Sequence, residues 1–509
     1  MCGINLLHMD PISDTQFKLL QQRFNETYKD IFQNKLAEKT VVIIPSLTLD
    51  AEMLNTIKGS VHYEERLLCM LMLLRMPRTQ VIFVTSVPID PCIIDYYLHL
   101  LPGITGQHAR ERLKLFACYD ASHISLTEKI LKRPRLIKRI RESIRFPNMA
   151  HMSCFNVTDF EKQLAVLLSI PIYGCDPDLL YLGTKTGSRR IFKKLGIDVP
   201  NGFEDLKNEM DIALSLARIK VSNPTLKKAV VKINDGFSGE GNAIFRYGNL
   251  SADNPLLANE ILACLPGTLN IVAANVSYHV FLSKFCTLGG IVEEFIEGEI
   301  KESPSVQCRI NPLGITDIIS THDQLLGGES GQVFIGATFP ASQEYTLEIA
   351  AAGEKIAEAL RLEGVKGRFG IDFLSIKEAG SWKHFAIEIN LRKGGTTHPF
   401  LMLQFLTEGE FNWKQGEFQM SGGQTRFYFA SDNVVNEKYK GLSPQDLIDI
   451  AMYNGLQYDG ARQEGVMFHM IGALSQYGKL GMVCIAKTEQ DAKDYFNKTI
   501  LILDTAAEE

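Results

Sequence analysis

Two segments, GRFGIDFLSI (367–376) and HFAIEINLRKGGTTHP (384–399), carry the clearest structural signal in this sequence. Both alternate apolar and polar residues, and this period of two predicts two adjacent extended strands. Successive side chains point to opposite faces of a strand, so Arg368, Gly370 and Asp372 share one face of the first strand. The apolar residues between them take the other face.

The second segment adds polar groups to the same surface. Its residues Glu388, Asn390 and Arg392 also share one face. The carboxylates of Asp372 and Glu388 and the amide oxygen of Asn390 then converge, and Mg²⁺ prefers such oxygen ligands. Arg392, one strand step beyond, is suited to bidentate binding of a planar anion. The alternative is a solvated polar edge, but burying these groups without a ligand would be costly.

A glycine-rich loop precedes these strands, in KKAVVKINDGFSGEGNAIFRYG (227–248). The apolar segments on either side of it predict two strands, Ala229–Ile233 and Ala243–Arg246. Small residues let backbone N–H groups approach phosphate oxygens, and the loop contains Gly236, Ser238, Gly239 and Gly241. Because it leads into a strand and not a helix, we expect a hairpin flap over a nucleotide, with Lys232 near the phosphates. An ordinary glycine-rich hairpin is the alternative.

The segment IVEEFIEGEI (291–300) combines an apolar strand with acidic residues and a glycine turn. Backbone groups from Glu294 to Ile296 are suited to pair with an adenine edge, and Glu299 is suited to accept from ribose hydroxyls. An acidic strand end on the surface is the alternative reading.

The remaining chain divides into regions of different pattern. Residues 1–175 alternate short apolar runs (40–48, 80–88 and 113–120) with helical stretches, which predicts parallel strands in an α/β layer. No G-x-G-x-x-G motif follows these strands, so we expect no nucleotide site there. We expect a central domain over 176–410, with the flap at about 227–295, and a small α+β domain over 411–509.

Composition restricts the class of function. The 509 residues include 53 Lys and Arg against 59 Asp and Glu, a net charge of −6, which argues against a nucleic-acid-binding chain. No apolar run reaches the roughly 18 residues of a membrane span, and no secretory signal is visible. The ten cysteines are scattered, with no C-x-x-C pair. We therefore expect reduced thiols in a cytoplasmic protein without membrane contact.

In order and spacing, these motifs resemble those of the ATP-grasp ligases over roughly residues 175–400. The matching elements are Lys185 in LGTKTGSRR, Lys232 with DGFSGEG, VEEFIEG, Asp372 in GIDF, and EINLR (388–392). The chain looks most similar to the pheganomycin-type peptide ligases, which carry phrases like STHDQLLGG (320–328), GATFPA (336–341) and EINLRKGGTTHPF (388–400). The resemblance implies an α/β and α+β protein in which a Rossmann-like pre-ATP-grasp domain precedes the ATP-grasp fold.

The resemblance also implies roles for individual residues. Lys185 and Lys232 would contact ATP, the glycine loop would cover its phosphates, Glu294 and Ile296 would present backbone groups to adenine, and Glu299 would hold ribose. Asp372, Glu388 and Asn390 would bind two Mg²⁺ ions, and Arg392 would hold the reacting carboxylate or acyl-phosphate. D-alanine ligases place an arginine two residues before the metal-binding aspartate. Gly370 stands there in this chain, and Arg368 either substitutes from the same face or is structural.

The implied reaction is ADP-forming ligation of a carboxylate to an amine through an acyl-phosphate, with small-molecule or peptide substrates. Two alternatives stay open, a kinase that phosphorylates a hydroxyl and a non-catalytic nucleotide-binding module. The resemblance is compatible with a homodimer.

Histidines offer candidate proton acceptors. His322, in an expected polar loop, and His398, after the Gly-Gly turn, are suited to bind substrate or to accept the proton of the amine. A structural role is the alternative for both. His469 lies in an apolar strand, and we expect it in the core.

Overall fold

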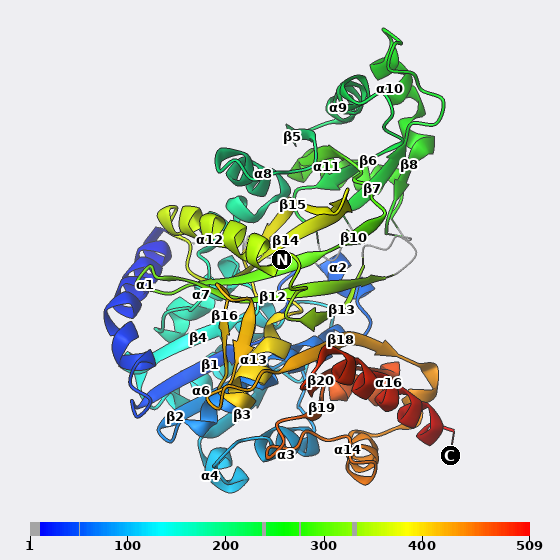
Figure 1. Cartoon of the computed structure of the whole chain (residues 1–509). Helices are drawn as coiled ribbons and strands as arrows, with labels where there is room; N and C mark the ends of the chain where they lie inside the picture. Colours follow the sequence, from blue (N-terminus) through cyan, green and yellow to red (C-terminus); the bar gives the residue numbers. More distant parts are fainter. Residues whose placement is uncertain (1–10, 50, 237–240, 274–275, 328–332, 509) are drawn as a thin grey trace.

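The computed structural model describes residues 11–49, 51–236, 241–273, 276–327 and 333–508, and these residues form three main sheets (Figure 1). The N-terminal sheet is parallel, in the order β3-β2-β1-β4. Its strands are β1 (Lys39–Ile44), β2 (Thr79–Thr85), β3 (Leu113–Ala117) and β4 (Ala150–Cys154). The sequence prediction of parallel strands is therefore confirmed for this region.

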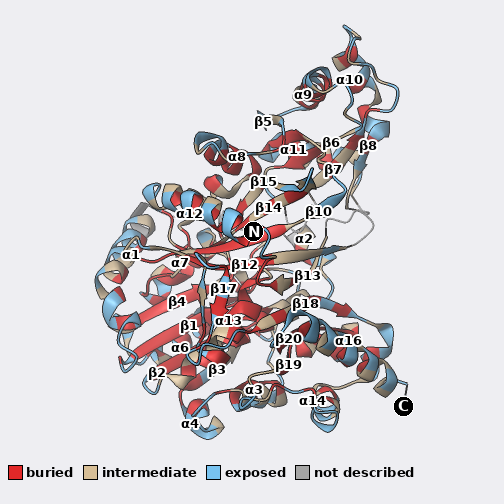
Figure 2. Ribbon diagram, in the orientation of Figure 1, coloured by how far each residue is buried: buried red, intermediate tan, exposed pale blue. Residues whose placement is uncertain are grey.

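Both faces of the N-terminal sheet are covered, because its strands are apolar on both sides. Val42 and Ile44 pack toward α1 and α5–α7, whereas Val41 and Ile43 pack toward η1 and α3. Figure 2 shows the buried strands and the exposed outer faces of the helices. The helical elements are α1 (Pro11–Phe32), α2 (Ala51–Thr56), η1 (Ser60–Arg75), α3 (Pro91–His99), α4 (Gly106–Glu111), α5 (Leu126–Leu131), α6 (Pro134–Ser143), η2 (Pro147–Met149) and α7 (Asp159–Leu168).

The second sheet is antiparallel, in the order β5-β9-β6-β7-β8, and lies at the top of Figure 1. It contains the expected hairpin, in which β6 pairs with β7 in a register that joins Lys232 to Asn242. A separate apolar cluster holds helices against this sheet. The elements are β5 (Gly202–Leu206), α9 (Glu209–Ser222), β6 (Lys228–Ile233), β7 (Asn242–Arg246), α10 (Leu257–Thr268), β8 (Leu269–Ile271), α11 (Tyr278–Leu288) and β9 (Gly290–Glu294).

The third sheet is the longest, in the order β10-β14-β11-β12-β13-β18-β20-β19, with β15 paired to β14. Helices α8 and α12 pack on it around an apolar cluster. The elements are η3 (Pro177–Gly183), α8 (Lys185–Lys194), β10 (Ile300–Glu302), β11 (Pro304–Ile310), β12 (Thr316–Gly327), β13 (Val333–Phe339), α12 (Thr346–Leu362), β14 (Gly367–Glu378), β15 (Ser381–Asn390) and α13 (Thr397–Thr407).

The C-terminal segment continues this third sheet, since β18 pairs with β13. The division at about residue 410 stays a proposal, and strands from both sides of it share one sheet. The C-terminal elements are β16 (Glu410–Asn412), β17 (Glu417–Gln419), β18 (Phe427–Val435), η4 (Glu437–Gly441), α14 (Pro444–Tyr453), β19 (Gly465–His469), η5 (Ile471–Ala473), α15 (Leu474–Tyr477), β20 (Lys479–Ala486) and α16 (Glu489–Ala506).

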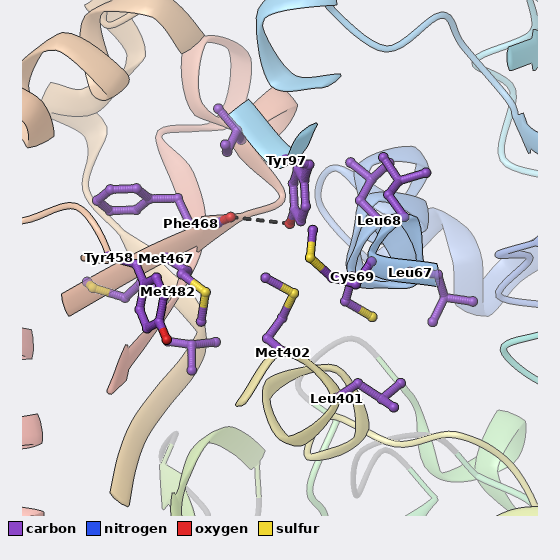
Figure 3. Packing of buried hydrophobic residues seen from close by; sticks show 14 of the residues in the cluster. Leu67, Leu68, Cys69, Tyr97, Leu401, Met402, Tyr458, Met467, Phe468 and Met482 are labelled. Atoms are coloured by element: carbon purple, nitrogen blue, oxygen red, sulfur yellow. Dashed lines mark hydrogen bonds between the residues drawn. The ribbon is translucent and has the colours of Figure 1, made fainter. Parts of the chain in front are cut away.

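One apolar core packs helices of the N-terminal region against strands of the C-terminal region (Figure 3). Residues of η1 and α3, Met402 of α13, and residues of β19 and β20 belong to this cluster, and the hydroxyl of Tyr97 donates to the carbonyl of Phe468 at 3.2 Å. The N-terminal sheet, α13 and the C-terminal strands are thereby packed into one body. Among the described residues, no helix has the length and apolarity needed to cross a bilayer.

Candidate active site

A cleft of about 1200 Å³ is lined by the second sheet, the third sheet and the C-terminal segment. Lys232 and Glu294 line it from the second sheet, whereas Asp372 and Glu388 line it from the third. The cleft therefore brings together some of the polar residues that the sequence singles out on separate strands.

The polar face of β14 and β15 forms one wall of this cleft. In the antiparallel register Asp372 faces Glu388 and Gly370 faces Asn390. The Asn390 amide donates to Asp372 Oδ2 at 2.8 Å, and the Gln324 amide donates to Asp372 Oδ1 at 2.7 Å. A Cβ added at Gly370 would meet no described atom within 4 Å, so the surface beside these groups is open. The predicted alternation holds from Arg368 to Asp372, whereas a register shift between Asp372 and Phe373 brings Phe373 and Ile387, expected on the other face, to the cleft as well.

Helix α8 places a lysine against this wall. The helix begins at Lys185, where Thr184 caps it by accepting from the N–H of Gly187 at 3.0 Å. The hydroxyl of Ser188 accepts from the backbone N–H of Ile389 at 3.0 Å and fastens the helix to β15. Lys185 Nζ consequently pairs with the carboxylate of Glu388.

The electrostatics of the wall fit a divalent cation. Burial, together with the neighbouring charge of Glu388, raises the pKa of Asp372 to about 6. Two carboxylates and an amide oxygen are hard donors, and a divalent cation bound between them would offset their repulsion. The donor set of Asp372, Glu388 and Asn390 therefore fits Mg²⁺, with Lys185 as a further positive charge.

Arg392 follows the strand and lines the same cleft. Burial lowers the pKa of its guanidinium, whereas the carboxylates of Glu388 and Asp372 raise it. Its backbone N–H donates to the carbonyl of Asn390 at 2.7 Å, which fixes the turn that carries the side chain. A planar cation thus lies beside the candidate metal ligands.

The opposite wall is the hairpin of the second sheet. Lys232 on β6 is buried, and its ammonium pairs with Glu293, which also accepts from Arg189 Nη1 at 2.9 Å. Gly236 and Gly241 line the cleft. Ser238 and Gly239 lie outside the described residues, so their roles stay predictions.

Replacing Lys232 with Met is expected to weaken ATP binding about tenfold or more, because a cation that faces the cleft is lost. Glu293 keeps its contact with Arg189, so the fold should survive. Titration calorimetry with Mg·ATP measures the effect. The matched control is Lys227→Met, an exposed lysine beside the same strand. Equal ATP affinity in both variants would contradict the assignment of Lys232 to the nucleotide site.

The expected adenine segment also lines the cleft, through Glu294 and Ile296. The N–H of Glu294 already donates to the carbonyl of Asn201 at 2.8 Å, and the carbonyl of Ile296 accepts from Lys301 at 3.1 Å. Their pairing with adenine stays a prediction. Glu299 is exposed and is not among the described residues that line the cleft, whereas Glu302 lines it. The position of Glu302 makes it a second candidate for a ribose contact.

Arg368 shares the strand face of Asp372 but lies further from the cleft, and it is not among the described residues that line it. Its register partner is Arg309, and burial, together with the charge of Arg309, lowers the pKa of Arg368 to about 10. This environment favours a structural role, and the catalytic role of Arg368 stays a prediction.

His398 is buried in α13 next to two polar partners. Its Nε2 lies 3.0 Å from Nε2 of His469 and 3.1 Å from Oδ1 of Asp432, a residue that lines the cleft. Burial lowers the pKa of His398 to about 4. His469 is buried, as expected, but it belongs to this polar cluster. The role of His398 as proton acceptor stays a prediction.

The expectation of a polar loop around His322 is wrong. His322 lies in β12, fully buried, with ring centroids 5.5 Å from Phe339 and 5.9 Å from Tyr428. Within the described chain neither ring nitrogen has a hydrogen-bond partner. Asp323 and Gln324, which follow His322 in the sequence, are only half-buried because the strand leaves the core at that point.

Replacing His322 with Leu is expected to make the protein less sensitive to acid. Burial lowers the pKa of His322 to about 3, so below about pH 6.5 the unfolded chain binds a proton there that the folded chain does not. This linkage removes about 2 kcal/mol from the free energy of unfolding between pH 7 and pH 5, and the variant lacks that loss. Urea unfolding at both pH values measures the difference. An identical loss in both proteins would contradict the assignment.

The cleft is also lined by residues that no sequence motif indicates. Arg66 on η1 lies between the rings of Tyr63 and Phe155, at 4.6 and 4.5 Å from their centroids. Lys479 of β20 lines the cleft beside them and donates to the Tyr63 hydroxyl at 2.8 Å. No local motif marks these side chains, since they meet only after distant segments pack together.

Comparison with known proteins assigns the fold. Residues 178–261 and 256–414 match a family model described as IQCH-like, ATP-grasp, and these ranges contain the cleft wall and the hairpin. Residues 178–414 thus resemble an ATP-grasp domain, over slightly less than half of the chain. Residues 446–499 of the same chain match the PGM1 C-terminal domain.

Curated relatives match nearly the whole chain. The L-propargylglycine–L-glutamate ligase of Streptantibioticus cattleyicolor is 26% identical over 470 residues, which cover 90% of this chain and 92% of that protein. The IQ motif-containing protein H of Danio rerio is 22% identical over 516 residues, and the match covers 92% of this chain. That match covers 48% of the Danio rerio protein, so the chain spans about half of its length.

Solved structures share the ATP-grasp fold at low sequence identity. The ADP complex of purK, N5-carboxyaminoimidazole ribonucleotide synthetase, has a TM-score of 0.51 at 12% identity and covers 93% of this chain and 98% of its own. The biotin carboxylase domain of Hydrogenobacter thermophilus 2-oxoglutarate carboxylase has a TM-score of 0.54 at 12% identity, covering 91% and 89%. The predicted fold class, an ATP-grasp fold after an α/β layer, is confirmed.

Proposed function

We propose that this protein is an ATP-dependent ligase that joins a carboxylate to an amine, forms an amide or peptide bond, and releases ADP and phosphate. The observation that carries the proposal is the arrangement of the cleft. Asp372, Glu388, Asn390 and Arg392 occupy one wall, and Lys232 faces the cleft from the hairpin of the second sheet. The similarity to an amino-acid ligase over 90% of the chain supports it.

The wall of Asp372, Glu388 and Asn390 would hold Mg²⁺, and we propose two ions. When bound, Mg²⁺ would supply charge neutralisation for the transferring phosphoryl group. Lys185 and Lys232 would hold ATP phosphates from two sides of the cleft. We assign the adenine edge to backbone groups from Glu294 to Ile296.

Arg392 would orient the substrate carboxylate for attack on the γ-phosphate, which gives an acyl-phosphate and ADP. The amine then attacks the acyl carbon, and phosphate leaves as the amide forms. Arg392 would stabilise the negative oxygen that develops in this second step. The hairpin of the second sheet would limit access of water, which would otherwise hydrolyse the acyl-phosphate.

The name of the similar ligase and the state of the described cysteines refine the proposal. The similar ligase is named for two amino acids, so we propose amino acids or short peptides as substrates.

The cysteines in the described part of the chain are free thiols, which supports a reducing, cytoplasmic environment.

A hydroxylamine trap separates the candidate functions. The protein would be incubated with Mg·ATP, hydroxylamine and sets of amino acids or peptides, and ADP and hydroxamate would be measured together. A ligase produces both, because hydroxylamine captures an activated acyl group. ADP with a phosphorylated acceptor and no hydroxamate would indicate a kinase. Nucleotide binding without ADP formation across the screen would indicate a non-catalytic module.

A further inference from the structure

Three side chains from separate elements converge beside the cleft, which Asp432 lines. His398 comes from α13, Asp432 from β18 and His469 from β19, elements that Figure 1 shows in the same part of the molecule. Nε2 of His398, Nε2 of His469 and Oδ1 of Asp432 lie 2.8 to 3.1 Å from one another. All three residues are at least nine-tenths buried.

The triangle can exist in two forms. A ring nitrogen of histidine carries either a hydrogen or a lone pair. If both Nε2 atoms carry hydrogen, both donate to Oδ1 of Asp432, at 2.8 Å from His469 and 3.1 Å from His398. If both lack hydrogen, two nitrogen lone pairs and a carboxylate oxygen lie close enough together to bind one metal ion.

A single cation suits the second form, because three lone pairs from the two rings and the carboxylate can then point at one centre. Imidazole nitrogens and a carboxylate oxygen bind Zn²⁺ at about 2.0–2.2 Å, and atoms spaced as these are can share one ion at that distance. The ligand types also suit other first-row transition metals and differ from the all-oxygen set of Asp372, Glu388 and Asn390.

Neighbouring residues leave room for the cluster and orient its carboxylate. Gly481 faces His469 in the β19–β20 register, and a Cβ at Gly481 would lie 2.0 Å from Nε2 of His469, so glycine leaves room for the ring. Arg66 Nη1 contacts the other oxygen of Asp432, Oδ2, at 3.4 Å, which orients the carboxylate. Asp432 and Arg66 both line the cleft, so the cluster borders it.

We propose that His398, Asp432 and His469 bind one divalent transition-metal ion of the Zn²⁺ class, separate from the Mg²⁺ site. The ion would join α13 of the ATP-grasp domain to the C-terminal strands β18 and β19. A coordination position directed toward the cleft would remain available to water or to a substrate group.

The test uses the untagged full-length protein after treatment with a chelator. Titration with Zn²⁺ alone should give about one bound ion per chain and a higher melting temperature. Co²⁺ in place of Zn²⁺ should give the visible d–d absorption of an ion held by nitrogen and oxygen ligands. Stoichiometry well below one ion, with no change in melting temperature, would overturn the proposal and leave a hydrogen-bonded triad.

Variants assign the bound ion to the cluster. His469→Ala should lower Zn²⁺ affinity by about a hundredfold or more, and Asp432→Asn, which keeps the shape of the side chain, should do the same if the alanine variant fails to fold. His322→Leu, which changes a buried histidine outside the cluster, and Glu388→Gln, which changes the candidate Mg²⁺ site, should keep wild-type Zn²⁺ affinity. Zn²⁺ affinity that falls in Glu388→Gln and survives in Asp432→Asn would contradict the proposed ligands. These readouts do not depend on ligase activity.

Discussion

Replacing Glu388 with Gln is expected to lower ADP formation by about a thousandfold or more while the protein stays folded. The variant loses one of two carboxylates that would hold Mg²⁺ and the negative partner of Lys185. A thousandfold loss corresponds to about 4 kcal/mol of transition-state stabilisation, within the range of several kcal/mol that a metal ion supplies. A coupled ADP assay with the substrates found in the hydroxylamine screen measures it.

The matched control is Glu378→Gln, a glutamate at the exposed end of the neighbouring strand β14. This variant should retain wild-type turnover. Circular dichroism and the melting temperature report whether Glu388→Gln is folded. If the folded Glu388→Gln variant formed ADP at the wild-type rate, Glu388 would not belong to the metal site.

Replacing Arg392 with Lys is expected to lower kcat about a hundredfold with little change in ATP affinity. Lysine keeps the positive charge but lacks the planar pair of donors that holds a carboxylate or a developing oxyanion. Because Arg392 is assigned to the acyl group and not to the nucleotide, the loss should appear in kcat and in hydroxamate yield. Steady-state kinetics together with calorimetry of Mg·ATP separate the two effects.

The control is Arg361→Lys, an arginine on α12 that pairs with Glu358 at the surface and should be unaffected in kcat. A large loss of ATP affinity in Arg392→Lys, with kcat unchanged, would move Arg392 to the nucleotide subsite and refute its assignment to the acyl group.

Local patterns were sufficient to predict the strands that carry the candidate metal ligands. The alternation around Asp372 and Glu388 is a property of each strand alone, so the shared polar face follows from the sequence. The hairpin around Lys232 was predictable for the same reason, since its two apolar runs flank a short glycine loop. The Gly-rich loop and the order of motifs then indicated the ATP-grasp fold.

Properties that depend on packing between distant segments were not predictable. His322 has polar sequence neighbours, but the strand carries it into an aromatic core, so its burial overrides the local pattern. Arg66 and Asp432 form a hydrogen bond although they are 366 residues apart in the sequence, and no local motif predicts such a contact. The pairing of Arg368 with Arg309 on the neighbouring strand β11 is likewise not visible in the sequence.

A crystal structure with Mn²⁺ and a non-hydrolysable ATP analogue tests the central assignment most directly. Mn²⁺ replaces Mg²⁺ at oxygen ligands, and its anomalous scattering locates it independently of the surrounding atoms. We expect anomalous peaks coordinated by Asp372, Glu388 and Asn390, with the triphosphate between this wall and Lys232. Triphosphate density elsewhere, with these three side chains free of metal, would contradict the account.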